Sequence, residues 1–186
     1  KRQLDLDTRK GKAPGGYQYY LQKSRVPFIF MNAAGLQGDL ETMIHEAGHA
    51  FHSIYCGHLE LIGERSYPIE FAEVASMSME LMTQNEWGEF YNDEEANRAR
   101  IGHLEGIIFL LPWIATIDSF QHWIYSNPGH TRDERKTVWN SIRDRFGSNM
   151  EWGDYQGHRD TSWQQQGHLF GVPFYYVEYG IAQLGA

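Results

Sequence analysis

Residues 41–56 constrain the fold of this chain more than any other part of its sequence, because they separate onto two faces of one helix. On a helical wheel, the polar side holds four residues within about 40° of one direction: His45, His49, His52 and Cys56. The opposite side holds the apolar residues Met43, Ala47, Ala50, Phe51 and Ile54. We therefore expect a helix whose apolar face packs into a core while its other face presents imidazoles.

His45 and His49 are one helical turn apart, the spacing at which two imidazoles can bind one metal ion. Glu46 lies about 100° around the helix from His45, beside the pair but not between them. It can reach a metal-bound water without competing for the metal. In this HExxH arrangement, zinc lowers the pKa of its water and the glutamate takes the proton. The sequence thus predicts one Zn²⁺ ion on His45 and His49, with Glu46 as general base.

Zinc in a catalytic site needs a third protein ligand. A third histidine six residues after the second is excluded, because Tyr55 occupies that position. The following helical segment offers Glu70 and Glu73, which are three residues apart and share a face. Either can bind the metal while the other orients a ligand, and Glu41, one turn before the first histidine, is another candidate for orienting a ligand. An exposed carboxylate without a role is an equally good interpretation of Glu41 and Glu70.

The other residues predict a mainly helical chain with one short strand. Residues 1–27 are rich in glycine and charge without a sustained period, so we expect mostly loop. The stretch 26–32 predicts a strand, and Pro27 near its start limits it to a sheet edge or requires that Pro27 be among the strand's first residues. Residues 147–171 hold five glycines and predict a long ordered loop. Five helices are expected. The first covers 39–56, with Asp39 as N-cap and Gly57 as stop, and the second covers 69–83. The third covers 93–125, with Asn92 as cap and a kink or break at Pro112; the fourth runs from the capping box of Thr131 and Glu134 to Phe146, and the fifth begins near Pro173.

Composition excludes several classes of partner. The formal net charge is -8, and basic residues form no run longer than a dipeptide, so nucleic acid is not expected. The longest apolar stretch, residues 107–117, is shorter than the roughly 18 to 20 residues that cross a bilayer, so no membrane partner is expected. A single Cys56 and the lack of a signal-peptide pattern favour the cytoplasm. The oligomeric state cannot be predicted from these features.

Several motifs resemble the thimet oligopeptidase and oligoendopeptidase F family of zinc peptidases. HEAGHAFH is followed by FAEVASMSMEL, which places Glu73 24 residues after His49, and GKAPGGY and PFIFMN precede them. The resemblance implies that Glu73 is the third zinc ligand and that the fold is a mainly α, zincin-like catalytic core with a short β-strand edge before the HExxH helix. Family members are longer, and this sequence begins at Lys1 and stops within an apolar run. We therefore expect residues 1–186 to be a single catalytic domain cut from a longer protein.

The segment from His168 to Tyr179 also resembles this family. In family members a histidine and tyrosines at these positions hold substrate and stabilise the tetrahedral intermediate, which implies catalytic roles for His168, Tyr176 and Tyr179. A phenol that donates to the developing oxyanion is a suitable stabiliser. The spacing from the histidine to the tyrosines is one residue shorter than in the thimet branch, so Tyr175 can exchange roles with Tyr176.

These features together predict a zinc metalloendopeptidase that hydrolyses short peptides. The alternative is a catalytically inactive fragment that binds zinc or peptide. If residues 28–32 form a free sheet edge, that edge can accept an extended peptide as an added strand. The competing interpretation is that the loop of residues 33–38 covers the edge.

Overall fold

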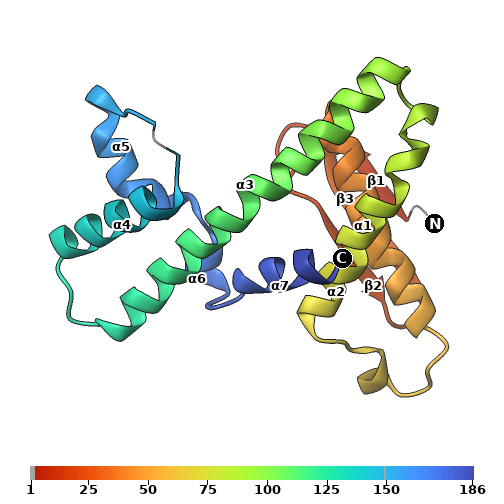
Figure 1. The fold of residues 1–186 in the computed structure, drawn as a ribbon. Helices are drawn as coiled ribbons and strands as arrows, with labels where there is room; N and C mark the ends of the chain where they lie inside the picture. The colour runs from red at the N-terminus through yellow and green to blue at the C-terminus, as the bar shows by residue number, and fades with distance from the viewer. Residues whose placement is uncertain (1–2, 149) are drawn as a thin grey trace. The chain divides into compact units, whose positions relative to one another are not determined.

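The computed structural model describes residues 3–148 and 150–186, which form two compact units. The first unit comprises the chain up to Gly102 together with Ala182–Ala186, and the second comprises His103–Ile181. The chain is mainly helical, as expected, with one small sheet in the first unit (Figure 1).

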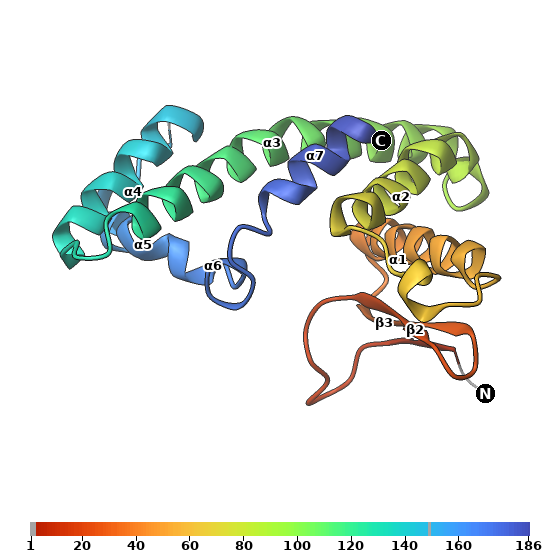
Figure 2. The ribbon, with the colours of Figure 1, turned by 90° about the horizontal axis from the view of Figure 1, so that it is seen from below.

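The first unit is built in layers, with helix α1 between a sheet and helix α2 (Figure 2). Its elements in chain order are β1 (Leu4–Asp7), β2 (Tyr17–Leu21), β3 (Val26–Ala33), α1 (Gln37–Cys56), η1 (Ile62–Arg65), α2 (Ile69–Met82), η2 (Thr83–Glu89) and the start of α3 (Asp93–Ser126). Ile29 and Met31 of β3 and Ala50 of α1 are buried. Trp87 of η2 is buried as well.

The sheet has the order β1-β3-β2, so the expectation that β3 is an edge strand is wrong. β3 pairs in parallel with β1 and antiparallel with β2, where Pro27 lies opposite Tyr20. Pro27 is only the second residue of β3, a position where a missing N–H costs little pairing. Residues 1–27 were expected to be mostly loop, but they contain both partner strands. The two outer strands of the described sheet are therefore β1 and β2.

Helix α1 begins two residues before the expected cap. The carboxylate of Asp39 accepts hydrogen bonds from the backbone N–H groups of Ala34 (2.7 Å) and Leu36 (2.8 Å), so it caps the helix from inside the first turn. The expected apolar core face is wrong in part, because Phe51 and Ile54 are each 51% exposed. The buried positions are instead small or polar: Glu46, Gly48, Ala50 and Ser53. Two closely packed neighbours, the sheet and α2, select small side chains there.

The second unit consists of helices around an aromatic core. After the rest of α3, its elements are α4 (Arg132–Phe146), η3 (Gly153–Tyr155), α5 (Gln156–Thr161), η4 (Ser162–Gln165), α6 (His168–Gly171) and the first part of α7 (Val177–Gly185). Ile117, Phe120, Trp139 and Leu169 are buried together, with Trp113 and Trp163 packed against them.

Some expectations for this part of the chain are confirmed and others are wrong. Asn92 caps α3 through a 3.0 Å bond from the Glu95 N–H, and the capping box of α4 is present. Pro112 lies inside α3 without ending it. The expected loop of residues 147–171 contains four short helical elements, and the last helix begins at Val177 rather than near Pro173.

Within the described residues, α3 is the one helix long and apolar enough to cross a membrane by length and composition. The continuous helix therefore supplies a longer apolar stretch than residues 107–117 alone. Core helices of water-soluble proteins satisfy the same criterion, so this property by itself assigns α3 no membrane role.

Candidate metal centre

Three predicted metal ligands converge in the first unit. Each of His45, His49 and Glu73 offers one ligand atom, and these atoms all lie within 4.8 Å of one another. The Glu73 Oε2 atom is 3.3 Å from the His45 Nε2 atom and 3.6 Å from the His49 Nε2 atom. The two imidazoles come from consecutive turns of α1, and the carboxylate comes from α2.

Close packing of α1 on α2 brings Glu73 to the two imidazoles. A Cβ atom at Gly48 would lie 2.6 Å from the Cα atom of Ser76 and 2.9 Å from the carbonyl oxygen of Ala75, closer than real Cβ contacts allow. Gly48 therefore lets the two helix backbones touch within the turn that carries the ligands. Ser76 is fully buried, and its hydroxyl donates to the Glu73 carbonyl (3.0 Å) and carboxylate (3.3 Å).

The two separations at Glu73 fit a zinc ion. Ligand atoms about 2.1 Å from one tetrahedral ion are about 3.4 Å apart from each other. The separations of 3.3 and 3.6 Å at Glu73 match this value. Two imidazole nitrogens and one carboxylate oxygen also form the donor set that zinc enzymes use with a fourth position open for water.

Glu80, a residue that the sequence analysis missed, holds the outer nitrogen of His45. Its Oε1 atom is 2.6 Å from His45 Nδ1, while Nε2 of the same ring faces Glu73. A carboxylate in this position fixes the ring and raises the basicity of the imidazole. A signal for it exists, since Glu80 follows Glu73 by seven residues, or two helical turns. The sequence suggested Glu70 and Glu41 as residues that orient a ligand. Glu70 lies outside the ligand group, and Glu41 accepts a hydrogen bond from Gln37 (3.2 Å).

The pKa values of the two imidazoles shift in opposite directions. Burial acts to lower the pKa of His45, but the hydrogen bonds to Glu73 and Glu80 and their charges outweigh it and raise that pKa to about 10. Burial lowers the pKa of His49, and the charge of Glu73 opposes this effect. A metal ion needs the neutral imidazole, so a metal bound at His45 would displace a proton.

Glu46 is a buried carboxylate next to the ligands. Burial raises its pKa, and the charge of His45 works in the opposite direction. Its Oε2 atom is buried and has no hydrogen-bond partner among the residues that the structure describes. A buried carboxylate oxygen without a partner is costly unless it has a ligand such as water.

His52 is also on the expected polar face of α1 but does not join the ligand group. Its ring stacks on Tyr67 at 3.9 Å, and Tyr67 in turn lies 3.1 Å from the Ser53 hydroxyl. This packing gives His52 a structural role beside the ligand group.

The predicted histidine and tyrosines of the C-terminal segment form a cluster of their own in the second unit. The Tyr179 hydroxyl is 3.4 Å from His168 Nε2, and the ring of Tyr176 is 5.0 Å from the imidazole. Tyr175 is also close, with its ring 5.8 Å from that of His168. Burial raises the pKa of Tyr176, opposed by a hydrogen bond with Trp113. The cluster joins one imidazole to three phenols.

Comparison with known proteins gives consistent matches. The family model for peptidase family M3 matches residues 1–186. Oligoendopeptidase F (chromosomal) of Lactococcus lactis subsp. cremoris is 27% identical over 136 residues, which cover 73% of this chain and 20% of that protein. Oligopeptidase PepF of Bacillus subtilis (strain 168) is 29% identical over 129 residues, which cover 67% of this chain and 19% of that protein.

A solved structure of PZ peptidase A with an inhibitor matches with a TM-score of 0.88 and 37% identity. The match covers 97% of this chain and 32% of that one. The chain therefore spans about a fifth of the length of the curated relatives and about a third of this structural neighbour.

Proposed function

Because this chain belongs to peptidase family M3, we propose that it is the metal-binding core of a zinc oligoendopeptidase that hydrolyses peptide bonds in short peptides. One observation carries the proposal: the Glu73 carboxylate lies within 3.6 Å of both imidazole Nε2 atoms, at separations that suit one shared ion. His45, His49 and Glu73 are the residues that would hold one Zn²⁺. The single Cys56 supports the cytoplasm as the proposed compartment.

The residues around this centre divide the chemistry between them. Zinc bound there would lower the pKa of a water to near 7 and polarise the scissile carbonyl. Glu46 accepts a proton from the attacking water and returns it to the amide nitrogen as the peptide bond breaks. Burial raises the pKa of Glu46, which makes this carboxylate a better proton acceptor than an exposed one. Glu80 holds the His45 ring in the orientation that binds metal.

His168, Tyr176 and Tyr179 are proposed to act on the substrate. A phenol O–H can donate to the carbonyl oxygen as negative charge develops on it. The contact between Tyr179 and His168 supports a shared role, because the imidazole can orient the phenol. The roles of these residues rest on the family resemblance.

The test is to change Glu46 to Gln in the enzyme that carries this chain. The amide keeps the shape of the side chain but cannot take a proton, so zinc should be retained and hydrolysis of a quenched fluorescent peptide should fall by a factor of roughly 100 or more. Glu41→Gln on the same helix is the matched control and should leave the rate unchanged. Near-normal hydrolysis by the Glu46 variant would remove the role given to this residue.

A second candidate function is a zinc- or peptide-binding module without catalysis. Zinc content together with peptide turnover distinguishes the two: zinc with turnover supports the enzyme, and zinc without turnover supports the module.

A further inference from the structure

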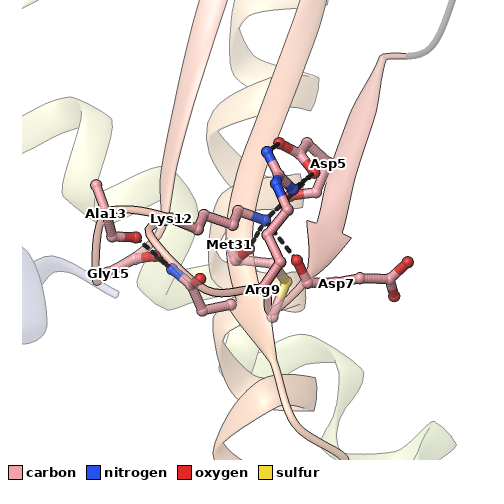
Figure 3. A network of polar contacts seen from close by, with 8 residues as sticks. Asp5, Asp7, Arg9, Lys12, Ala13, Gly15 and Met31 are labelled. Carbon is pink, nitrogen blue, oxygen red and sulfur yellow. Dashed lines mark hydrogen bonds and ion pairs between the residues drawn. The ribbon is translucent and has the colours of Figure 1, made fainter.

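The buried side chain of Lys12 attaches the loop between β1 and β2 to the sheet through hydrogen bonds. The side chain of Lys12 is 1% exposed, although the loop around it is largely exposed. Its ammonium donates to the carbonyl oxygens of Asp5 (3.0 Å), Asp7 (2.9 Å) and Met31 (2.5 Å), as Figure 3 shows. It also lies 3.3 Å from the Asp5 carboxylate and 4.4 Å from the centre of the Phe30 ring. Lys12 thus ties the loop to β1 and β3 at once.

A second fastening holds the same loop one to three residues further on. Asn32 of β3 donates from Nδ2 to the carbonyl oxygens of Ala13 (2.6 Å) and Gly15 (3.0 Å), the two residues of this contact that Figure 3 labels. The side-chain amide has two N–H donors, and these bonds use both. The backbone from Lys12 to Gly15 is therefore attached to β3 at successive points.

The fastened loop leads directly to Glu46. A Cβ atom at Gly16 would lie 2.9 Å from the Thr42 Cγ2 atom and 3.5 Å from the Glu46 Oε1 atom. Strand β2 begins at the next residue, Tyr17, and packs on α1. Gly16 and the first residues of β2 thus form one wall of the position that the carboxylate occupies.

We propose that Lys12 and Asn32 are positioning residues for Glu46: they hold the backbone of residues 16–18 against its carboxylate and so fix where that carboxylate meets its water. This inference rests on the proposed function only for the role of Glu46 as the base. Stability alone does not require a buried ammonium, because replacing a buried ionic group by an apolar one is often neutral or stabilising. The ammonium instead selects one loop geometry, since it needs several oxygens placed around it.

The first test compares variants in the zinc-loaded enzyme that carries this chain. Lys12→Met keeps an unbranched side chain that is one atom shorter and has no N–H donors, and Asn32→Asp keeps the shape of the side chain while removing both donors. We expect one bound zinc per chain, KM within about threefold of the parent, and kcat reduced at least about tenfold, because misplacing a reacting group by about 1 Å can cost roughly 100-fold. Lys10→Met, an exposed lysine in the same loop, should change nothing.

Two further measurements separate positioning from plain stability. If Lys12 acts through Glu46, then Lys12→Met should lower the residual kcat of Glu46→Gln by less than about twofold, because the two changes remove one function. Amide hydrogen exchange of residues 13–18 should be at least about tenfold faster in Lys12→Met and Asn32→Asp than in Lys10→Met. Exchange does not depend on activity.

The proposal is overturned if kcat stays within about threefold of the parent, whether or not exchange is faster, or if kcat falls equally in the Glu46→Gln background. Should Lys12→Met not fold, Asn32→Asp decides on the same criteria. If the unaltered enzyme binds zinc but cleaves no peptide, the proposed function fails. Amide exchange then tests the loop attachment alone. Exchange of residues 13–18 in Lys12→Met and Asn32→Asp that is as slow as in Lys10→Met would overturn the attachment, and faster exchange would support it.

Discussion

Glu73 is the one carboxylate that lies next to both imidazole Nε2 atoms among the described residues. Glu73→Gln replaces a charged oxygen by a neutral amide, so we expect the loss of most of the bound zinc, measured by metal analysis after dialysis. Glu70→Gln, three residues earlier on the same helix, is the matched control and should retain the metal. Stoichiometric zinc in the Glu73 variant would shift the ligand role to Glu70.

Glu80 holds the other side of His45 at 2.6 Å. Glu80→Gln can present an N–H to a ring nitrogen that should itself carry the proton, so the imidazole loses its orientation. We expect zinc affinity to fall 10- to 100-fold, the range found for such outer partners, measured by competition with a chromophoric chelator. An unchanged affinity would mean that the Glu80 contact does not support the metal.

At the scale of residues, the sequence predicts the part of the site that one helix carries. The spacing of His45, Glu46 and His49 is local, so helical geometry alone relates them. The choice of Glu73 needed the family resemblance, because Glu70 shares its face. Glu80 was missed since spacing along α2 does not give the distance from α2 to α1, which depends on the contact at Gly48.

The contact between Gly48 of α1 and Ser76 of α2 leads to a prediction about the packing of these two helices. Gly48→Ala would force α1 and α2 apart, because the added Cβ meets the backbone of Ser76 at 2.6 Å. Overpacking of this kind costs about 1 to 3 kcal/mol, and zinc affinity should fall with it, measured by urea unfolding and chelator competition. Gly38→Ala, in the first turn of α1 with nothing within 4 Å of the added atom, should not destabilise the protein. Equal stability of the two variants would contradict the close packing.

In the second unit, Asp160 of α5 joins α5 to α4. It pairs with Lys136 (2.8 Å) and accepts hydrogen bonds from Asn140 (2.7 Å) and Gln156 (2.9 Å). The bond with Lys136 is the largest cause that lowers the pKa of Asp160 to about 2, although burial opposes it. The folded protein therefore protonates the Asp160 carboxylate less readily than the unfolded chain does. The stabilisation that Asp160 contributes is complete above about pH 4 and is lost as the pH falls through about 2.

Asp160→Asn should therefore be less stable than the parent at pH 6, and the difference should shrink between pH 4 and pH 2. Urea midpoints followed by circular dichroism at pH 6 and pH 3 measure both differences. The exposed Asp154→Asn is the control and should show no such difference. A gap between Asp160→Asn and the parent that stays constant with pH would contradict this assignment.

At the scale of elements, long periodic helices were predictable and short strands were not. The helices α1, α2 and α4 have local caps or breakers that mark their ends, such as Gly57 and Thr131. β1 has four residues, too few for a periodic signal, and its pairing with β3 is a contact between distant segments. Pro27 suggested that β3 is an edge strand, but β1 and β2 pair with it on both sides, and these pairings between separate segments leave no local signal.

At the scale of the whole molecule, the metal ligands belong to the first unit and the histidine-tyrosine cluster belongs to the second. Their proposed joint action on one substrate is tested by kinetics of the whole enzyme. Tyr176→Phe removes one donor to the oxyanion, so kcat should fall by about 100- to 1,000-fold with zinc retained. Tyr155→Phe, an exposed tyrosine of the second unit, should be silent.

Tyr175→Phe belongs to the same series. If this variant is slow while Tyr176→Phe is near normal, the role moves by one residue, as the shorter spacing allows. Normal kcat in all three variants at Tyr175, Tyr176 and Tyr179 would separate the cluster from the chemistry.

The aromatic core of the second unit has a practical consequence for spectroscopy. Of the six tryptophans, Trp87 alone belongs to the first unit, where it is buried, and the others lie between residues 103 and 181. Intrinsic fluorescence of this chain therefore reports mainly on the unit that does not contain the metal ligands. A melting curve followed by tryptophan emission can look normal in a variant whose first unit has already unfolded.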